Sequence, residues 1–245
     1  MPSLLLRYFA KCVFCLFFTT SVSAKNDSLL IIENQFKSPA GVWSSEPKLK
    51  QARVRSVVIW FHGGMQSTNC KKGVVAGRGL YELLNDSTVI VASPSACQNS
   101  HWISPELILI TDKLIDSLES RFKMPIQEID LAGISDGGLG VLAYSLNGKR
   151  VVRSRLLISS NLSVLGQAKV LAKAPKLKSG TWTFLQGGHD RLYPADVILP
   201  WLRSFCEGIG PSCELHFDEL GEHDWSYWAK KRPDWIRGFR SSKIP

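Results

Sequence analysis

Short apolar runs alternate along the chain with segments whose apolar residues recur at the period of a helix. Short apolar, β-branched runs predict buried strands at 55–61 and 88–92. Further strands are expected at 127–132, 156–159, 181–186 and 213–217. Ser104 and Pro105 are typical of a helix start, and apolar residues recur every three or four positions behind them. Further helices are expected at 137–146, at 195–206 and from residue 225 onward.

This alternation predicts an α/β fold with a mostly parallel central sheet and helices on both faces, because strands that are apolar throughout must be covered on both sides. The length of 245 residues fits one domain, which we expect over residues 25–245. The Lys-rich stretch 161–180 leaves room between two strands for a short excursion only. No large lid is therefore expected.

The N-terminus has the features of a secretory signal. Arg7 and Lys11 precede the apolar run 12–18, and small residues follow up to Ala24. We expect residues 1–24 to be a signal peptide cleaved after Ala24, and the protein to be secreted or periplasmic. The alternative is an uncleaved, anchoring N-terminus. No uninterrupted apolar run reaches the length of a membrane-spanning helix, so stable membrane insertion is not expected.

Four cysteines lie outside the predicted signal, and an even number in an exported protein suggests two disulfides. Four cysteines allow three pairings. We favour Cys70 with Cys97, which each follow a predicted strand, and Cys206 with Cys213, which flank a segment that must turn sharply. The alternative is four buried free thiols.

The formal net charge is +9, and its cations are scattered in short runs at 48–55, 149–155, 169–178 and 230–232. Such runs are usually solvated faces. No zinc-finger, RNP or helix-turn-helix spacing accompanies them, so a nucleic-acid partner is not expected.

The sequence Gly133-Ile134-Ser135-Asp136-Gly137 matches G-x-S-x-G between a predicted strand and a predicted helix. This context favours a tight turn that exposes the Ser135 hydroxyl, with glycines that allow strand and helix to approach closely. The N-terminus of the helix would present free N–H groups to a developing negative charge. We therefore interpret Ser135 as a nucleophile; a glycine-rich turn without chemistry is the alternative.

The loop His62-Gly63-Gly64 follows the first strong strand and is a candidate for the second half of an oxyanion hole. We expect the backbone N–H groups of Gly64 and Asp136 to be the donors. Met65 is the alternative if the loop is shifted by one residue. His62 is expected to hold the loop by hydrogen bonds rather than to transfer protons.

A nucleophilic serine needs a base, and the base needs an orienting carboxylate. Asp190 and His223 each follow a later predicted strand, where site residues gather in open α/β sheets. We predict His223 as the base and Asp190 as its carboxylate partner. Alternatives are His189 for the base and, for the carboxylate, the residues Asp196, Asp218, Glu219 and Asp224.

The sequence resembles an α/β-hydrolase, and more narrowly the secreted esterases of the esterase D, feruloyl esterase and polyhydroxybutyrate depolymerase group. The resemblance rests on 62–64, 133–138, 187–194 and 221–228, and covers about residues 55–240. It departs from that group at Glu222, where a second glycine is usual, and at His189. The resemblance implies the α/β-hydrolase fold and a Ser135–His223–Asp190 triad, neither of which these departures affect.

The expected function is therefore that of a secreted serine esterase, which cleaves carboxylic esters through an acyl-enzyme. Its partner is expected to be a small-molecule or polymer-borne ester, and no cofactor or metal is expected. A metallohydrolase is disfavoured because no H-x₃-H spacing occurs. The alternatives are a serine peptidase of the prolyl-oligopeptidase type and a catalytically silent hydrolase fold used for binding.

Overall fold

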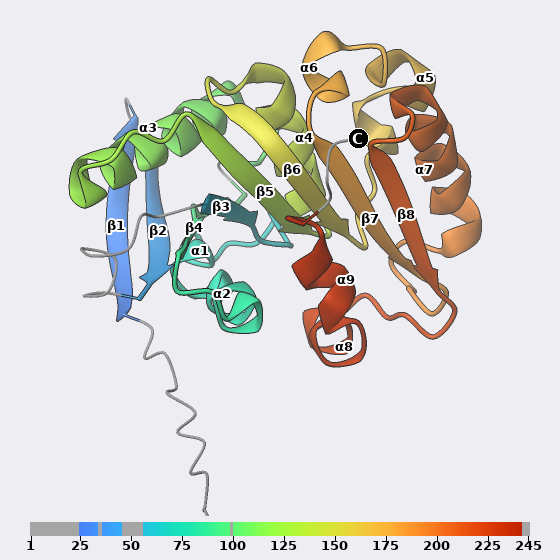
Figure 1. Cartoon of the computed structure of the whole chain (residues 1–245), viewed down its shortest axis with the longest axis horizontal. Coiled ribbons are helices and arrows are strands. Elements are labelled where there is room, and N and C mark those ends of the chain that lie inside the picture. Colours follow the sequence, from blue (N-terminus) through green and yellow to red (C-terminus); the bar gives the residue numbers. More distant parts are fainter. Residues whose placement is uncertain (1–24, 34–35, 46–55, 99, 242–245) are drawn as a thin grey trace, which may run out of the picture.

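The computed structural model describes residues 25–33, 36–45, 56–98 and 100–241. The predicted signal peptide 1–24 and the basic run 48–55 lie outside the described residues. The described chain folds around one eight-stranded sheet, in the order β1-β2-β4-β3-β5-β6-β7-β8 (Figure 1). The six strands β3 to β8 are parallel to one another, as the sequence predicted. Near one edge of the sheet, β2 is antiparallel to both of its neighbours, β1 and β4.

The strands are β1 (Lys25–Glu33), β2 (Phe36–Ser44), β3 (Ser56–Phe61), β4 (Val89–Ser93), β5 (Glu128–Ile134), β6 (Val151–Ile158), β7 (Thr181–Gly187) and β8 (Cys213–Asp218). The helices are α1 (Gly73–Ala76), α2 (Arg78–Leu84), α3 (Pro105–Phe122), α4 (Gly137–Asn147), α5 (Ala168–Leu171), α6 (Pro175–Lys178), α7 (Ala195–Ile209), α8 (Trp225–Lys231) and α9 (Pro233–Gly238). The six predicted strands are all present, although β6 begins at Val151 rather than at residue 156.

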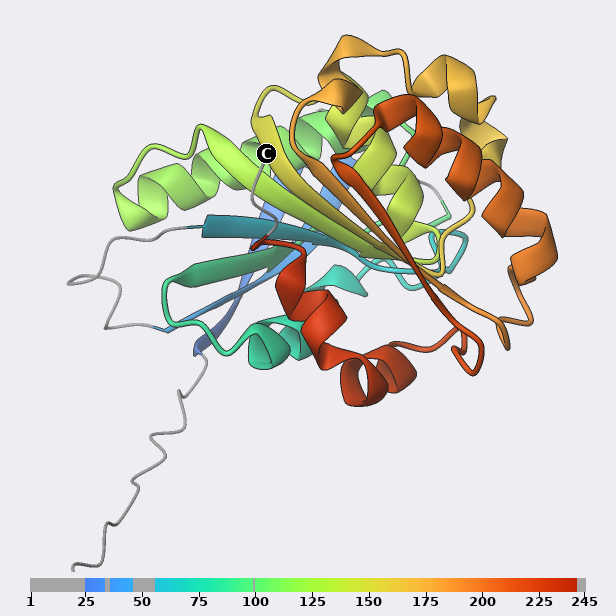
Figure 2. The ribbon, with the colours of Figure 1, turned by 45° about the vertical axis from the view of Figure 1, so that its right-hand side comes forward.

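Helices cover both faces of the sheet (Figures 1 and 2). Two apolar cores lie between the layers. Apolar residues of α3, α4 and α7 pack in one core, and those of α2, α8 and α9 pack in the other. Strand β3 shows why both faces are apolar. Val57 and Ile59 face the first core, whereas Val58 and Trp60 face the second.

The start of α3 follows the prediction in detail. Ser104 is the N-cap and its hydroxyl accepts a hydrogen bond from Leu107 N at 3.3 Å, while Pro105 occupies the first turn. Proline costs nothing at this position because the first N–H groups of a helix have no partner within the helix.

The segment 161–180 between β6 and β7 contains a short 3-10 helix (Ser163–Leu165) and the short helices α5 and α6. It lies above the sheet beside α7, with which α5 is packed (Figure 1). No large lid is present in the described ranges. None of the helices in those ranges is both long and apolar enough to cross a bilayer.

Both favoured disulfides are formed. Cys70 is bonded to Cys97, and Cys206 at the end of α7 is bonded to Cys213 at the start of β8. The first disulfide ties the loop after β3 to the loop after β4, two segments that lie at the carboxyl end of neighbouring strands.

The basic run 149–155 is not wholly a solvated face, contrary to the prediction. Arg155 on β6 is only 1% exposed. Its guanidinium lies 4.5 Å from the ring centroid of Trp182 and donates to Ser145 Oγ and to Ser179 O, each at 2.8 Å. Burial lowers the pKa of Arg155 to about 9. The ring of Trp182 and the oxygen acceptors stabilise the positive charge of Arg155. Sequence spacing does not reveal these partners.

Candidate active site

Ser135 lies in the sharp turn between β5 and α4, with a φ of 55°. A residue other than glycine seldom adopts this left-handed conformation, and it marks a strained turn. The turn is tight because strand and helix nearly touch. A Cβ atom on Gly133 would lie 2.5 Å from the Gly137 carbonyl oxygen, and one on Gly137 would lie 1.9 Å from that of Phe61. Both motif glycines are therefore required sterically, as the sequence predicted.

The loop after β3 lies directly against this turn. A Cβ atom on Gly63 would be 3.1 Å from Ser135 Cβ and 3.7 Å from Ser135 Oγ. Parallel pairing of β3 with β5 brings the two segments together, since Phe61 and Gly133 are register partners. The His-Gly-Gly loop and the serine therefore meet at the carboxyl edge of the sheet, where ligands bind in open α/β folds.

His62 holds this loop by hydrogen bonds, in the role predicted for it. Its Nε2 accepts from Ala96 N at 3.0 Å, so Nδ1 carries the proton and donates to the Gly63 carbonyl oxygen at 2.9 Å. Burial lowers the pKa of His62 to about 4, outweighing the hydrogen bond to Gly63, which raises it. The imidazole is therefore neutral near pH 7 and has no free nitrogen for proton transfer.

The three candidate oxyanion donors differ in their availability. The N–H of Met65 donates to Asp136 Oδ2 at 3.1 Å and is thus already engaged. Within the described part of the chain, the N–H groups of Gly64 and Asp136 form no hydrogen bond. This geometry favours Gly64 and Asp136 over the Met65 alternative.

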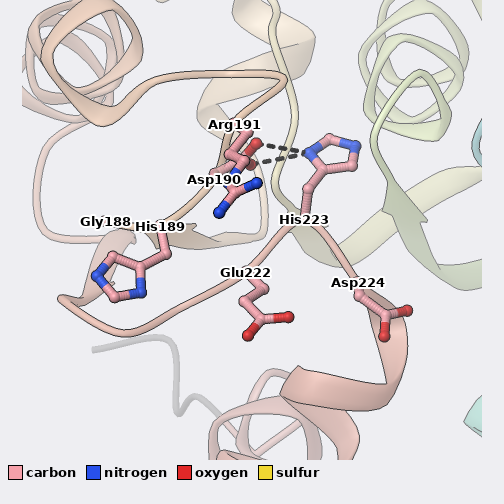
Figure 3. A pocket seen from close by; sticks show the side chains of 7 residues that line it. All are labelled: Gly188, His189, Asp190, Arg191, Glu222, His223 and Asp224. Atoms are coloured by element: carbon pink, nitrogen blue, oxygen red, sulfur yellow. Dashed lines mark hydrogen bonds and ion pairs between the residues drawn. The ribbon is translucent and has the colours of Figure 1, made fainter.

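The buried Asp190 and the half-buried His223 form a hydrogen-bonded pair (Figure 3). Nδ1 of His223 lies 2.9 Å from Oδ1 and 2.8 Å from Oδ2 of Asp190, which is only 3% exposed. Because a carboxylate only accepts hydrogen bonds, Nδ1 carries the proton in the neutral imidazole, and that tautomer has its lone pair on Nε2. Asp190 belongs to the loop after β7 and His223 to the loop after β8.

The Asp190 carboxylate is held as an anion. Burial raises its pKa, but hydrogen bonds donated by His223 and by Tyr193 N outweigh burial and bring the pKa below its ordinary value. The backbone N–H groups of Leu192 and Tyr193 donate to Oδ1 at 3.0 and 2.8 Å. These bonds fix the carboxylate in the orientation that receives His223.

Tyr193 links Ser135 to the His223–Asp190 pair, and sequence analysis did not single it out. Its ring centroid lies 5.0 Å from that of His223, in an edge-to-face arrangement. Burial and the charge of Asp136 raise the pKa of Tyr193, while the nearby Ser135 hydroxyl lowers it, so this side chain is close to Ser135 as well. No hydrogen bond joins Ser135 to His223 in the described structure. The sequence signal that could have identified Tyr193 was its position three residues after Asp190, in a strand-end loop.

The alternative acids and base have other surroundings. Asp218 accepts from Arg232 Nε at 2.6 Å and from Tyr227 Oη at 2.9 Å, and Asp224 caps α8 by accepting from Ser226 N. His189 is exposed. Asp196 lies in the first turn of α7. None of them is hydrogen-bonded to His223 in the described structure.

An open pocket of about 680 Å³ adjoins the His223–Asp190 pair. Its lining is polar and comes from the two loops that carry the pair, as Figure 3 shows: Gly188, His189, Asp190, Arg191, Glu222, His223 and Asp224. Both departures from the resembled esterases, His189 and Glu222, are in this lining. In the residues that the structure describes, no three His, Cys, Asp or Glu side chains are grouped as a metal site requires.

No protein-family model matches the chain, and no curated protein sequence does. Solved structures do. A ferulic acid esterase is 18% identical with a TM-score of 0.65, and the match covers 87% of this chain and 98% of that one. A thermostable esterase is 16% identical with a TM-score of 0.63, over 88% of this chain, which spans only 61% of that esterase's length.

An acylaminoacyl peptidase from Pyrococcus horikoshii is 11% identical with a TM-score of 0.59, over 86% of this chain and 39% of that one. At such low sequence identity, these structural similarities are evidence for the fold alone. Together with the parallel sheet, the helices on both its faces and the strand–serine–helix turn, they show that the chain has the α/β-hydrolase fold.

Proposed function

We propose that the chain is a serine hydrolase that cleaves carboxylic esters, with Ser135 as nucleophile, His223 as base and Asp190 as the carboxylate that orients the base. The observation that carries this proposal is the left-handed Ser135 just before α4, facing the His62–Met65 loop, with the hydrogen-bonded His223–Asp190 pair on the strand-end loops. The fold shared with esterases supports the same class of reaction.

In the acylation step, His223 Nε2 takes the proton of Ser135 as Oγ attacks the ester carbonyl carbon. Asp190 stabilises the imidazolium that forms and keeps Nδ1 protonated throughout. The carbonyl oxygen becomes an oxyanion, which the N–H groups of Gly64 and Asp136 receive. Collapse of this intermediate expels the alcohol, which takes its proton from His223, and leaves an acyl group on Ser135.

Deacylation repeats these roles with water in place of the serine hydroxyl. His223 removes a proton from water, hydroxide attacks the acyl carbon, and the same N–H groups receive the second oxyanion. The proton on His223 then returns to Ser135 as the carboxylic acid leaves. Loss of one oxyanion donor typically costs a factor of about 10² to 10³ in rate.

We propose that the substrate is a small-molecule or polymer-borne ester. We also propose that the protein binds no nucleic acid and is not stably inserted in a membrane. The pocket beside the His223–Asp190 pair is open, and Ser135 is not in its lining; such an open surface leaves room for soluble esters or chain ends. We also propose that residues 1–24 direct export, followed by one catalytic domain over 25–245. The two disulfides fit a secreted or periplasmic location.

A serine peptidase is the second candidate, because the acylaminoacyl peptidase of Pyrococcus horikoshii has the same fold. It would use the same residues on an amide. Ester and anilide substrates with the same acyl group distinguish the two activities.

The test is hydrolysis of p-nitrophenyl acetate, butyrate and octanoate by the protein from residue 25 onward, beside Ser135→Ala. Ser163→Ala, which removes an exposed hydroxyl after β6, is the matched control. We expect turnover that Ser135→Ala abolishes and Ser163→Ala retains. Equal turnover by wild type and Ser135→Ala would reject the assignment, and faster cleavage of the matching anilides would favour the peptidase.

A further inference from the structure

We propose that the side chain of Asp136 is a positioning residue that ties the oxyanion loop to the loop carrying Asp190, with Tyr193 as its partner. This inference rests on the proposed function. It assigns to Asp136 a second role, distinct from the backbone N–H already placed in the oxyanion hole.

The carboxylate of Asp136 does not form the hydrogen bonds that are usual for an aspartate at its position. Asp136 is the N-cap of α4, where an aspartate side chain normally accepts hydrogen bonds from the first turn of its own helix. Here it forms no such capping bond. Instead Oδ2 accepts from Met65 N at 3.1 Å and Oδ1 accepts from Tyr193 Oη at 3.0 Å. Both partners are far away in the sequence, on different loops.

The first of these bonds fixes the peptide unit that follows Gly64. Its N–H, on Met65, donates to Asp136, while its carbonyl oxygen accepts from Ser67 N at 3.1 Å and from Lys72 Nζ at 3.3 Å. The preceding peptide unit is held through the Gly63 carbonyl oxygen by His62. Gly64 has a φ of +69°, and a glycine can rotate its flanking peptides more freely than other residues. The clamps on both sides therefore determine where the Gly64 N–H points.

The second bond connects the same carboxylate to the acid–base pair. Tyr193 donates from its hydroxyl to Asp136, donates from its backbone N–H to Asp190, and packs its ring against His223. Burial and the negative charge of Asp136 raise the pKa of Tyr193, which keeps the phenol protonated as a donor. One carboxylate thus links the oxyanion loop, the serine turn and the loop that positions the base.

A direct chemical role for this carboxylate does not fit its contacts. Both of its oxygens accept hydrogen bonds from protein groups, so neither is aimed at the Ser135 hydroxyl as a base would be. Preorganised donors lower the barrier because they need no rearrangement during the reaction, and a displacement of about 1 Å can cost about 10²-fold in rate. Asp136 therefore acts through the geometry of the oxyanion hole.

The experiment compares kcat and KM for p-nitrophenyl butyrate in wild type, Asp136→Ala, Asp136→Asn and Tyr193→Phe. The matched control is Asp86→Ala, since Asp86 also accepts from a backbone N–H and a hydroxyl, both of Thr88, at 2.9 and 2.7 Å. We expect Asp136→Ala to lower kcat by about 10²-fold with KM changed less than threefold. Tyr193→Phe keeps the ring and loses one bond, so it should lower kcat by about tenfold.

Asp136→Asn separates positioning from general loss of structure. Its amide oxygen can accept from Met65 N and its NH₂ can donate to Tyr193 Oη, so we expect kcat within about fivefold of wild type. A kcat in Asp136→Asn as low as in Asp136→Ala would overturn the proposal. So would wild-type kcat in both Asp136→Ala and Tyr193→Phe. If Asp136→Ala does not fold, Tyr193→Phe and Asp136→Asn decide alone. A wild-type protein without esterase activity instead rejects the proposed function.

Discussion

His223 presents Nδ1 to both carboxylate oxygens of Asp190, at 2.9 and 2.8 Å, and so keeps Nε2 free for the serine side of the site. Asp190→Asn places an amide there, and an amide NH₂ donates to Nδ1 and stabilises the wrong tautomer. We expect kcat for p-nitrophenyl acetate to fall by about 10⁴-fold, because the triad then holds the wrong tautomer of the base. The melting temperature, measured alongside, should change far less than activity.

Asp218→Asn is the control for this prediction. Asp218 is also buried and is the last residue of β8, but its partners are Arg232, Tyr227 and Leu220 N. We expect kcat within threefold of wild type and a loss of stability instead. If Asp218→Asn removed the activity and Asp190→Asn retained it, the assignment of the acid would be wrong.

Gly137 leaves no space for a side chain beside the serine turn, because a Cβ atom would lie 1.9 Å from the carbonyl oxygen of Phe61. Backbone at that distance must move, so Gly137→Ala should destabilise the fold by about 3 kcal/mol or more, the upper range of overpacking. Gly238→Ala is the comparison, since no atom lies within 4 Å of its added Cβ. Denaturant unfolding should find Gly238→Ala within about 1 kcal/mol of wild type. Equal stability of the two variants would contradict the tight turn.

His62 makes stability depend on pH in a defined window. Its pKa is about 4 in the folded chain, against an ordinary value of 6.5, so the unfolded chain binds the proton more readily. Stability is therefore highest above pH 6.5 and falls as the pH drops towards 4. From these two values we expect a loss of about 2 kcal/mol between pH 7 and pH 5 from this group.

The check is the free energy of unfolding at pH 7 and pH 5 for wild type and His62→Asn. The asparagine amide can still donate to the Gly63 carbonyl but does not titrate, so the loss between the two pH values should shrink by about 2 kcal/mol. His189→Asn, at an exposed histidine, should leave the wild-type difference unchanged. If the loss of stability between pH 7 and pH 5 were the same in His62→Asn as in wild type, His62 would not be the group that makes stability depend on pH.

The central part of the fold could be predicted from the sequence because β3, β4, β5 and β7 are buried on both faces and are therefore rich in apolar residues. The antiparallel strands β1 and β2 were not predicted. In β1, Leu30 and Ile32 are exposed although apolar, so the run carries no clear alternation. The short helices α1 and α2 were also missed, because glycines at 73, 77 and 79 disguise a helical pattern.

The candidate site was predictable where a local motif carries it. Ser135 has its G-x-S-x-G turn, and Asp190 and His223 each follow a predicted strand. The contacts of Tyr193 and of the Asp136 carboxylate were not predictable, because they join loops that only the folded sheet brings together. The same holds for Arg155, whose partners are carbonyl and hydroxyl oxygens and a ring rather than an acid.

The most direct test of the central claim is the intact mass of the folded protein after treatment with a fluorophosphonate, followed by peptide mapping. We expect the addition of one phosphonyl group, located on Ser135, and none in Ser135→Ala. We also expect much slower labelling in His223→Ala, because the serine then lacks its base. An unlabelled wild-type protein that also hydrolyses no ester, or a label on another serine, would show that Ser135 is not the nucleophile.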